Sequence, residues 1–242
     1  MAIVQSIILR TNRLQGGYCI VTALTRFGVI NFSIRNSLKE KYRFSEEFIV
    51  GEFELKDNKK FSNLEFKKGE LGTGNNPNSL IRFYMLRLVR DIILETTEGI
   101  EIEQFESVYE NFQKLLSKES EHSVGIVGAC LGFLAYYRNL LGCSFEINKC
   151  LRCGSTSNIV GYSISGPGLI CANCFDPRES VSIGKEEFSV LRKMFETTGE
   201  TSVWVSVPKG SELRLLELVL ALYQYDFSVR TKICEELSQL LR

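Results

Sequence analysis

The chain has 242 residues, of which 44% are apolar and 24% charged, and its formal net charge is zero. This composition excludes a disordered chain, because disordered chains combine low hydrophobicity with a high net charge. Because the net charge is zero, the charge of the whole chain gives no indication of binding to nucleic acid or to a membrane surface. The N-terminal third differs from the average, since residues 1–79 contain 12 Lys and Arg against 8 Asp and Glu.

The opening residues, MAIVQSIILR, have no basic segment followed by a long apolar run, so we expect no signal peptide. No apolar stretch approaches the roughly 18 residues that a membrane span needs. We therefore expect a cytoplasmic protein without membrane association. Its eight cysteines should be reduced in that compartment, so cysteines that cluster indicate a metal site more than disulfides.

Residues 1–76 predict a β-domain. Five short segments are rich in Val, Ile, Phe and Tyr and are bounded by Gly, Asn and charged residues, namely 2–9, 17–24, 29–34, 47–55 and 60–66. The spacing leaves no room for parallel crossovers, so the sheet should be antiparallel. Closure would remove its exposed edges, and a five-stranded OB-fold barrel is the simplest solution, with another small closed barrel as the alternative.

The Gly-, Asn- and Pro-rich stretch 67–79 separates this domain from a helical domain, 77–242. Apolar residues at helical spacing predict helices at 80–94, 103–116, 124–142, 182–196, 212–225 and 226–242. Gly142 suits a C-terminal cap and Asp226 an N-terminal cap of the last helix. The predicted class is therefore α+β with two domains, and a cysteine-rich insert occupies about 148–178.

This insert contains two Cys-x-x-Cys pairs, Cys150 with Cys153 and Cys171 with Cys174. The spacing C-x2-C-x17-C-x2-C falls within the range of zinc sites, and each pair can place two thiolates on one ion. GYSISGPGLI between the pairs predicts two short strands around a turn, as in a zinc ribbon. Four thiolates leave no open coordination position, so we expect one structural zinc per chain and no catalytic zinc. A redox dithiol would need a thioredoxin-like βαβ unit, which the sequence lacks.

No catalytic constellation is visible. The single histidine, His122, lies in a polar segment that reads as a loop, and the four aspartates are scattered. The chain has neither a P-loop nor a dinucleotide-binding glycine motif. The remaining cysteines are isolated and read as small core residues, namely Cys19, Cys130, Cys143 and Cys234. We therefore expect a non-enzymatic protein.

The β-domain carries a candidate surface for nucleic acid. Barrels of this kind bind single strands through a basic groove and aromatic side chains on which bases stack. The candidate phosphate-binding residues are Arg10, Arg13, Arg26, Arg35, Lys39, Lys41 and Arg43. Tyr42 is the candidate exposed aromatic residue, because it lies within the basic run KEKYR. The competing interpretation is that the aromatic residues fill the barrel core and the basic residues are ordinary solvated surface.

Three stretches of the chain form a recognisable combination: IVQSIILRTNRLQGGYCIVTALTRFGVINFSIRNS (3–37), GACLGFLAYYRNLLGCSFEINKCLRCGS (128–155) and PGLICANC (167–174). Together they resemble the RecO family of bacterial DNA recombination and repair mediators over nearly the whole chain. This resemblance implies an N-terminal OB domain, a helical domain and a zinc-binding insert. It also implies binding of single- and double-stranded DNA and annealing of complementary strands.

The same resemblance implies protein partners: RecR, single-strand-binding protein and, indirectly, RecA, which would be loaded onto DNA. The loop RNSLKEKYR contains Glu40 and no Pro, which predicts weaker or more partner-dependent DNA binding than in members with denser basic loops. Two alternatives stay open. One is a protein–protein adaptor with a structural zinc ribbon and no DNA binding. The other is a nuclease, which the missing carboxylate cluster disfavours.

Overall fold

The computed structural model describes residues 2–35, 47–55, 64–71, 80–117, 119–196, 204–229 and 233–241. By its internal contacts the chain divides into two compact units. The first consists of Met1–Asn78 and Thr97–Glu119, and the second of Ser79–Thr96 and Ser120–Arg242. Among the described residues, none of the helices is both long enough and apolar enough to cross a membrane.

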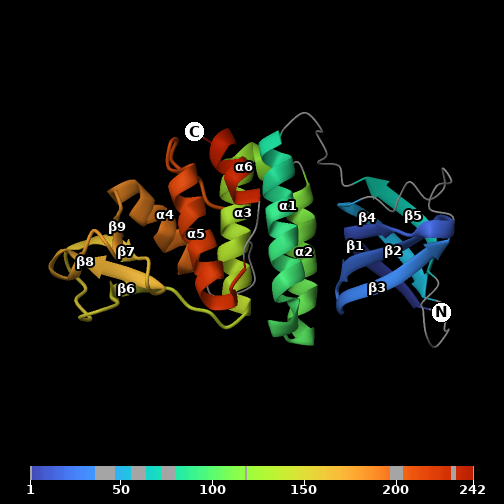
Figure 1. Ribbon diagram of the computed structural model, residues 1–242, viewed down its shortest axis with the longest axis horizontal. Coiled ribbons are helices and arrows are strands. Elements are labelled where there is room, and N and C mark those ends of the chain that lie inside the picture. Colours follow the sequence, from blue (N-terminus) through green and yellow to red (C-terminus); the bar gives the residue numbers. More distant parts are fainter. Residues whose placement is uncertain are drawn as a thin grey trace. The chain divides into compact units, whose positions relative to one another are not determined.

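Five strands form one antiparallel sheet in the first unit (Figure 1), in the order β3-β2-β1-β4-β5. The longest strand, β1, lies at the centre because its first half pairs with β4 and its second half with β2. The strands are β1 (Ala2–Arg13), β2 (Tyr18–Thr25), β3 (Gly28–Arg35), β4 (Ile49–Leu55) and β5 (Leu64–Leu71). The predicted antiparallel pairing is thus observed.

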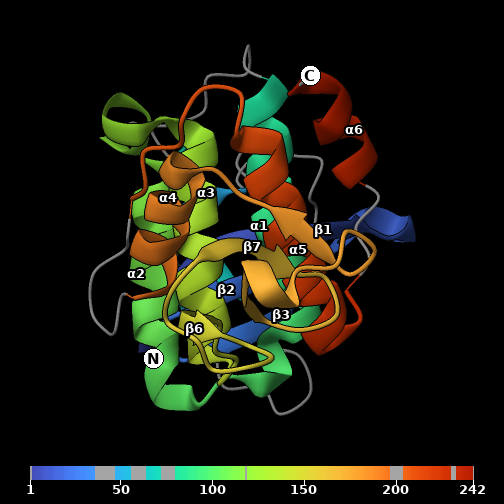
Figure 2. The same cartoon turned by 90° about the vertical axis from the view of Figure 1, so that its left-hand side faces the viewer.

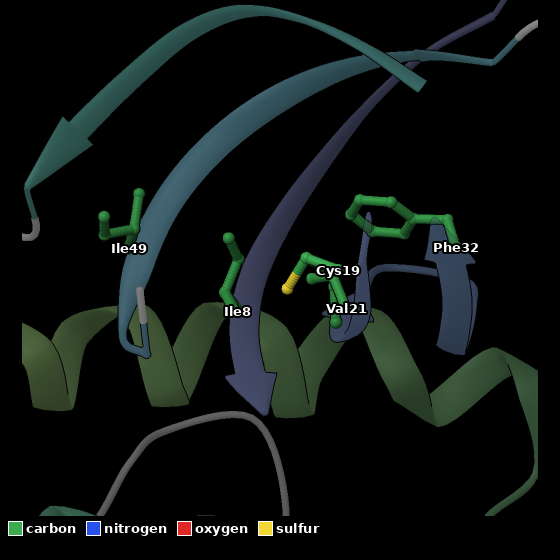
Figure 3. Packing of buried hydrophobic residues seen from close by; sticks show 6 residues of the cluster. Ile8, Cys19, Val21, Phe32 and Ile49 are labelled. Atoms are coloured by element: carbon green, nitrogen blue, oxygen red, sulfur yellow. The ribbon is translucent and has the colours of Figure 1, made fainter. Parts of the chain in front are cut away.

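The core of this unit follows from the two-residue period of its strands. In β2, Cys19, Val21 and Ala23 are buried while Tyr18 and Ile20 are exposed. The buried side chains pack in one cluster with residues of the neighbouring strands (Figure 3): Ile8, Cys19, Val21, Ala23, Phe32 and Ile49. Helix α2 (Phe105–Leu116) also packs against β1 and β2, so the unit encloses a core between the sheet and a helix.

The fifth strand differs from the prediction in its limits. The sequence predicts a strand at 60–66 followed by a break from residue 67, whereas β5 runs from Leu64 to Leu71. Its charged stretch pairs in register with β4, Lys68 opposite Glu52 and Glu70 opposite Val50. Charged residues are common on edge strands because they discourage pairing with other chains, so polarity did not mark the end of this strand.

The second unit is mainly helical (Figure 1). It contains α1 (Leu80–Thr96), α3 (Glu119–Leu140), α4 (Lys185–Phe195), α5 (Glu212–Phe227) and α6 (Ile233–Leu240). Helix α3 is the central element, since every residue from Val127 to Arg138 is buried. After α3, Gly142 adopts the positive φ of 78° and its N–H donates to the Asn139 carbonyl, so the predicted C-terminal cap is confirmed.

Two local predictions in this unit are wrong. Asp226 lies in the last turn of α5 and does not cap the final helix, because its carboxylate is held by the buried Arg138 side chain. His122 belongs to α3 and not to a loop, although a break at Gly125, where φ is 74°, separates its turn from the rest of the helix. The sequence KESEHS has no apolar residue at helical spacing, so the pattern did not predict this first part of α3.

A small four-stranded sheet is inserted between α3 and α4, and we call it the cysteine sheet. Its strands are β6 (Glu146–Cys150), β7 (Ile159–Ser163), β8 (Gly168–Cys171) and β9 (Ser180–Ser182), in the order β6-β8-β7-β9. The β6–β8 pair is parallel and the others are antiparallel. Figure 2 shows this sheet next to α4 and α5. Phe145 stacks on Phe195 of α4 with 4.7 Å between ring centroids.

Gly128 of α3 has no room for a side chain. A Cβ atom at this position would lie 2.0 Å from the carbonyl oxygen of Val205, which belongs to the segment that leads to α5. We expect Gly128→Ala to lower the free energy of unfolding by at least about 2 kcal/mol, because backbone atoms must move. Thermal unfolding followed by circular dichroism measures this loss.

Gly184 supplies the matched control. Its φ of −79° suits any residue, and a Cβ there would make only an ordinary contact at 3.8 Å. Gly184→Ala should therefore change the melting temperature little. Equal melting temperatures for the two alanine variants would show that the segment around Val205 does not pack on Gly128.

Candidate metal centre and nucleic-acid interface

Two similar turns of the cysteine sheet present the four thiols. The first turn follows β6, where Gly154, at a φ of 74°, donates its N–H to the Cys150 carbonyl over 2.9 Å. The second follows β8, where Cys171 ends the strand and a short 3-10 turn, Ala172–Cys174, completes the pair. The positive φ explains why a glycine follows the first pair. Both Cys-x-x-Cys pairs are thus held by backbone geometry.

The four sulfur atoms converge on one point. The Sγ atoms of Cys150, Cys153, Cys171 and Cys174 all lie within 4.8 Å of one another, and those of Cys153 and Cys171 are 3.6 Å apart. A tetrahedral zinc ion with Zn–S bonds of about 2.3 Å requires sulfurs about 3.8 Å apart. A disulfide needs about 2.05 Å, so the Cys153–Cys171 pair is not one. The predicted ligands therefore fit a tetrahedral thiolate-bound ion.

The surroundings favour ionisation of Cys150 and oppose ionisation of Cys174. Burial opposes ionisation of Cys150, but backbone N–H groups of Cys171, Cys153 and Arg152 outweigh it and lower the pKa of this thiol to about 6. The pKa of Cys174 is raised to about 12, first by its hydrogen bond with Cys153 and then by desolvation. Such crowded thiols cannot all ionise alone, since the negative charges repel. A bound dication would remove that repulsion.

The centre is covered on one side and open on the other. Cys150 and Cys171 are buried against Ile170, with Ile159 and Phe175 packed around them, whereas Cys153 is exposed. The strands are short, and they bury Ile147, Tyr162, Leu169 and Ile170. A metal ion would add to the stability that this burial gives the cysteine sheet, as in small zinc-binding domains.

The other cysteines are separate from this centre. Cys19 and Cys130 are fully buried, as predicted for small core residues, and burial raises the pKa of both thiols. Cys143 is half-buried, so its core assignment holds only in part. Cys234 lies in α6, and its side chain is outside the described residues.

Strands β1, β2 and β3 share one exposed face. Directly paired residues of an antiparallel sheet point to the same side, and Arg10, Thr22 and Asn31 form one such row across the three strands. Thr22 Oγ1 donates to Asn31 Oδ1 over 2.6 Å, which confirms that these two side chains share the face. The next exposed rows contain Ile20 and then Tyr18.

This face combines charge with exposed apolar surface. Arg10 is exposed, and Tyr18 and Ile20 keep 41% and 37% of their surface in contact with solvent. Arg35 ends β3 directly opposite Tyr18, although its side chain is outside the described residues. An exposed tyrosine in a row of polar and basic positions can stack on a base. We call Arg10, Tyr18, Ile20, Thr22 and Asn31 the sheet face.

The other predicted basic residues lie elsewhere. Arg13 is exposed at the end of β1, but it pairs in register with the buried Cys19 and so belongs to the opposite side from Arg10. Arg26, in the β2–β3 turn, is held by Glu106 at 3.0 Å and Glu110 at 3.5 Å. These two carboxylates compete with any phosphate for its guanidinium.

The remaining candidates, Lys39, Lys41, Tyr42 and Arg43, lie outside the described residues. Tyr18 is one of the aromatic residues interleaved with the predicted basic positions, for which a stacking role and a place in the core were both open. The structure leaves it 41% exposed and pairs it in register with Arg35. Strand register, which depends on both strands of a pair, decides between the two interpretations.

An antiparallel sheet with a basic and aromatic face, combined with a helical unit that holds a four-cysteine centre, defines a two-unit α+β protein with a candidate metal site. A family model described as Recombination protein O C terminal matches residues 77–233. This range covers well over half of the sequence, and the chain belongs to the RecO family. Membership implies a role as a non-enzymatic mediator of DNA repair and recombination. A search of curated proteins finds no match to the chain.

Proposed function

We propose that the chain binds single- and double-stranded DNA and anneals complementary strands in the bacterial cytoplasm. With RecR, it would help to load RecA onto DNA coated by single-strand-binding protein. Family membership supports the mediator role. The observation that carries the DNA-binding part is the sheet face, where Arg10 and the exposed Tyr18 lie on the same side of β1 and β2.

We further propose two domains, 1–76 and 77–242, with the first closed as an OB-type barrel. The support for closure is that the edge strands β3 and β5 contact each other. A sheet closed in this way presents a continuous curved face to a flexible strand. Arginine neutralises phosphate there, and the tyrosine ring offers a stacking platform. Holding two strands on basic surfaces reduces their repulsion and speeds pairing.

The four cysteines would hold one structural zinc. In this proposal the ion contributes no chemistry to DNA; it fixes two turns of the cysteine sheet and keeps the four thiolates together. The support is the convergence of four sulfurs within 4.8 Å. The closed set of four thiolates agrees with a structural role, because catalytic zinc keeps a position open for water or substrate.

A variant of the sheet face tests the DNA site. Arg10→Glu combined with Tyr18→Ala should weaken binding of a fluorescent single-stranded oligonucleotide about tenfold or more, since a phosphate contact and a stacking contact are both lost. Fluorescence anisotropy at low salt gives the affinity. Wild-type binding should fall steeply as salt rises, because phosphate contacts release counterions.

Lys114→Glu is the matched control, because Lys114 is exposed at the end of α2 in the same unit and the substitution changes the charge equally. It should leave the affinity near that of the wild type. If both variants lose affinity equally, net charge and not the sheet face governs binding. If neither does, the DNA site lies elsewhere, and absence of any binding would favour the protein-adaptor alternative.

A further inference from the structure

The two most exposed large apolar side chains of the described residues lie at the same end of helix α2. Phe27 is 71% exposed and Ile102 is 69% exposed. Ile102 begins the short turn that immediately precedes α2. Phe27 lies at the tip of the β2–β3 turn. A Cβ atom added to the next residue, Gly28, would lie 3.8 Å from the ring of Phe105, the first residue of α2, so the turn packs against the start of this helix.

The β2–β3 turn is fixed in this place by its neighbour. Arg26 pairs with Glu106 and Glu110 of α2, and its guanidinium lies 5.7 Å from the ring centroid of Tyr109. Thr25 Oγ1 donates to the Gly28 carbonyl and accepts from the Phe27 N–H, which closes the turn. Phe27 is thus presented to solvent by an ordered turn, which makes its exposure a built feature of the surface.

Acidic residues flank Ile102 in the sequence. No Lys or Arg occurs between Asp91 and Gln113, while the same stretch contains seven Asp and Glu. Glu98, Glu101 and Glu103 are exposed, and within the described parts of the chain none of them forms an ion pair. Arg26 neutralises only the carboxylates one and two turns further along α2.

This charge excludes DNA as the occupant, because phosphates and carboxylates repel each other. Thr25 ends β2 beside the acidic end, and Tyr18 of the sheet face starts this strand about 23 Å away. The nearest row of the sheet face, at Thr22, lies three residues or about 10 Å from Thr25. Exposed apolar groups within a polar rim are typical of protein-binding surfaces. The acidic rim selects a partner with the opposite charge.

We propose that Phe27 and Ile102, with Glu98, Glu101 and Glu103 around them, form a docking surface for a protein partner. The partner segment presents Lys or Arg side chains beside apolar ones. The apolar side chains bury Phe27 and Ile102, and the cations pair with the three carboxylates. The chain can then hold DNA on the sheet face and a protein at the acidic end of the same unit.

Photo-crosslinking in the bacterium that encodes the chain tests this surface. The full chain carries benzoyl-phenylalanine in place of Ile102, and a second version carries it in place of Tyr225, which is 58% exposed on α5. We expect a discrete protein adduct from position 102 and not from position 225. Mass spectrometry should place the crosslink in a segment that contains Lys or Arg next to apolar residues.

Reversal of the three acidic charges tests whether the adduct depends on them. Glu98→Lys with Glu101→Lys and Glu103→Lys should reduce the adduct from position 102 about tenfold, because like charges then oppose docking. Reversal of Glu186, Glu217 and Glu236, which are exposed in the other unit, should leave it unchanged. No adduct, an adduct to DNA, an adduct between two copies, or a yield insensitive to the triple reversal would each overturn the proposal.

The docking surface and the sheet face are separate sites, and DNA binding by the variants distinguishes a failure of one from a failure of the other. The triple variant should bind naked oligonucleotides at least as well as the wild type, because it removes negative charge far from the stacking tyrosine. Phe27→Ser keeps the charge and removes the exposed ring, so it should also reduce the adduct while DNA binding stays unchanged. If a variant loses both DNA binding and the adduct, the unit is unfolded, and the result supports neither the docking surface nor the sheet face as a separate site.

Discussion

Replacement of Cys150 by serine is expected to release the metal and to unfold the cysteine sheet. Cys150 is buried, ends β6 and lies within 4.8 Å of the other three sulfurs. Serine cannot supply a thiolate, and structural zinc in small domains contributes on the order of 10 kcal/mol to folding. The strands of this sheet have only three to five residues each, so we expect the burial of Leu169 and Ile170 to be too small to hold them without the ion.

The measurement is zinc content by elemental analysis together with thermal unfolding. Wild-type protein should contain about one zinc per chain, as four thiolates require. Cys150→Ser should lose most of it and show an additional unfolding transition at low temperature, since the sheet opens locally. Cys143→Ser is the control, because Cys143 is only half-buried and is not part of the cluster. Full zinc content and unchanged unfolding in Cys150→Ser would contradict the centre.

Replacement of Arg138 by methionine is expected to cost about 3–5 kcal/mol of unfolding free energy, because it leaves a partner carboxylate without its cation. Arg138 is 1% exposed and Asp226 is 11% exposed, and the Nη2–Oδ2 distance is 2.6 Å. Arg138 also donates to the Cys143 carbonyl over 3.2 Å. The residue therefore joins α3, α5 and the segment that leads into β6. Melting temperature should fall by about 10 °C.

A second variant distinguishes the lost ion pair from lost packing. Arg138→Met combined with Asp226→Leu removes both charges and should recover much of the stability, since no buried charge remains unpaired. Arg192→Met is the control for an exposed ion pair, because Arg192 and Glu196 meet on the surface of α4, and it should cost less than about 1 kcal/mol. If Arg138→Met is as mild as Arg192→Met, Arg138 does not stabilise the junction.

Local patterns were sufficient to predict much of the molecule. The alternation in β2 and the apolar length of α3 indicate a strand and a central helix without any tertiary information. The four candidate metal ligands can be named from the sequence, because each Cys-x-x-Cys pair forms a turn of only four residues. The turn between β7 and β8 was predicted for the same reason, since Gly166, Pro167 and Gly168 stand together.

The errors and omissions come from contacts between distant residues. Asp226 reads as a helix cap from its neighbours, but Arg138, 88 positions earlier, holds its carboxylate. Arg26 is predicted to bind phosphate, and the structure adds Glu106, 80 positions later, as a competing partner. For Tyr18 the sequence leaves a stacking role and a core position both open, and strand register places it on the sheet face. Local propensity carries no information about such partners, which only the tertiary fold supplies.

Annealing of two complementary labelled oligonucleotides, with and without the protein across a salt series, tests the central claim most directly. The wild type should accelerate annealing at low salt, and the acceleration should fade as salt rises, because counterions replace phosphate contacts. Arg10→Glu with Tyr18→Ala should remove the acceleration, and Lys114→Glu should retain it. No acceleration by the wild type at low salt, with no DNA bound, would contradict a DNA-annealing mediator and leave the sheet face without this function.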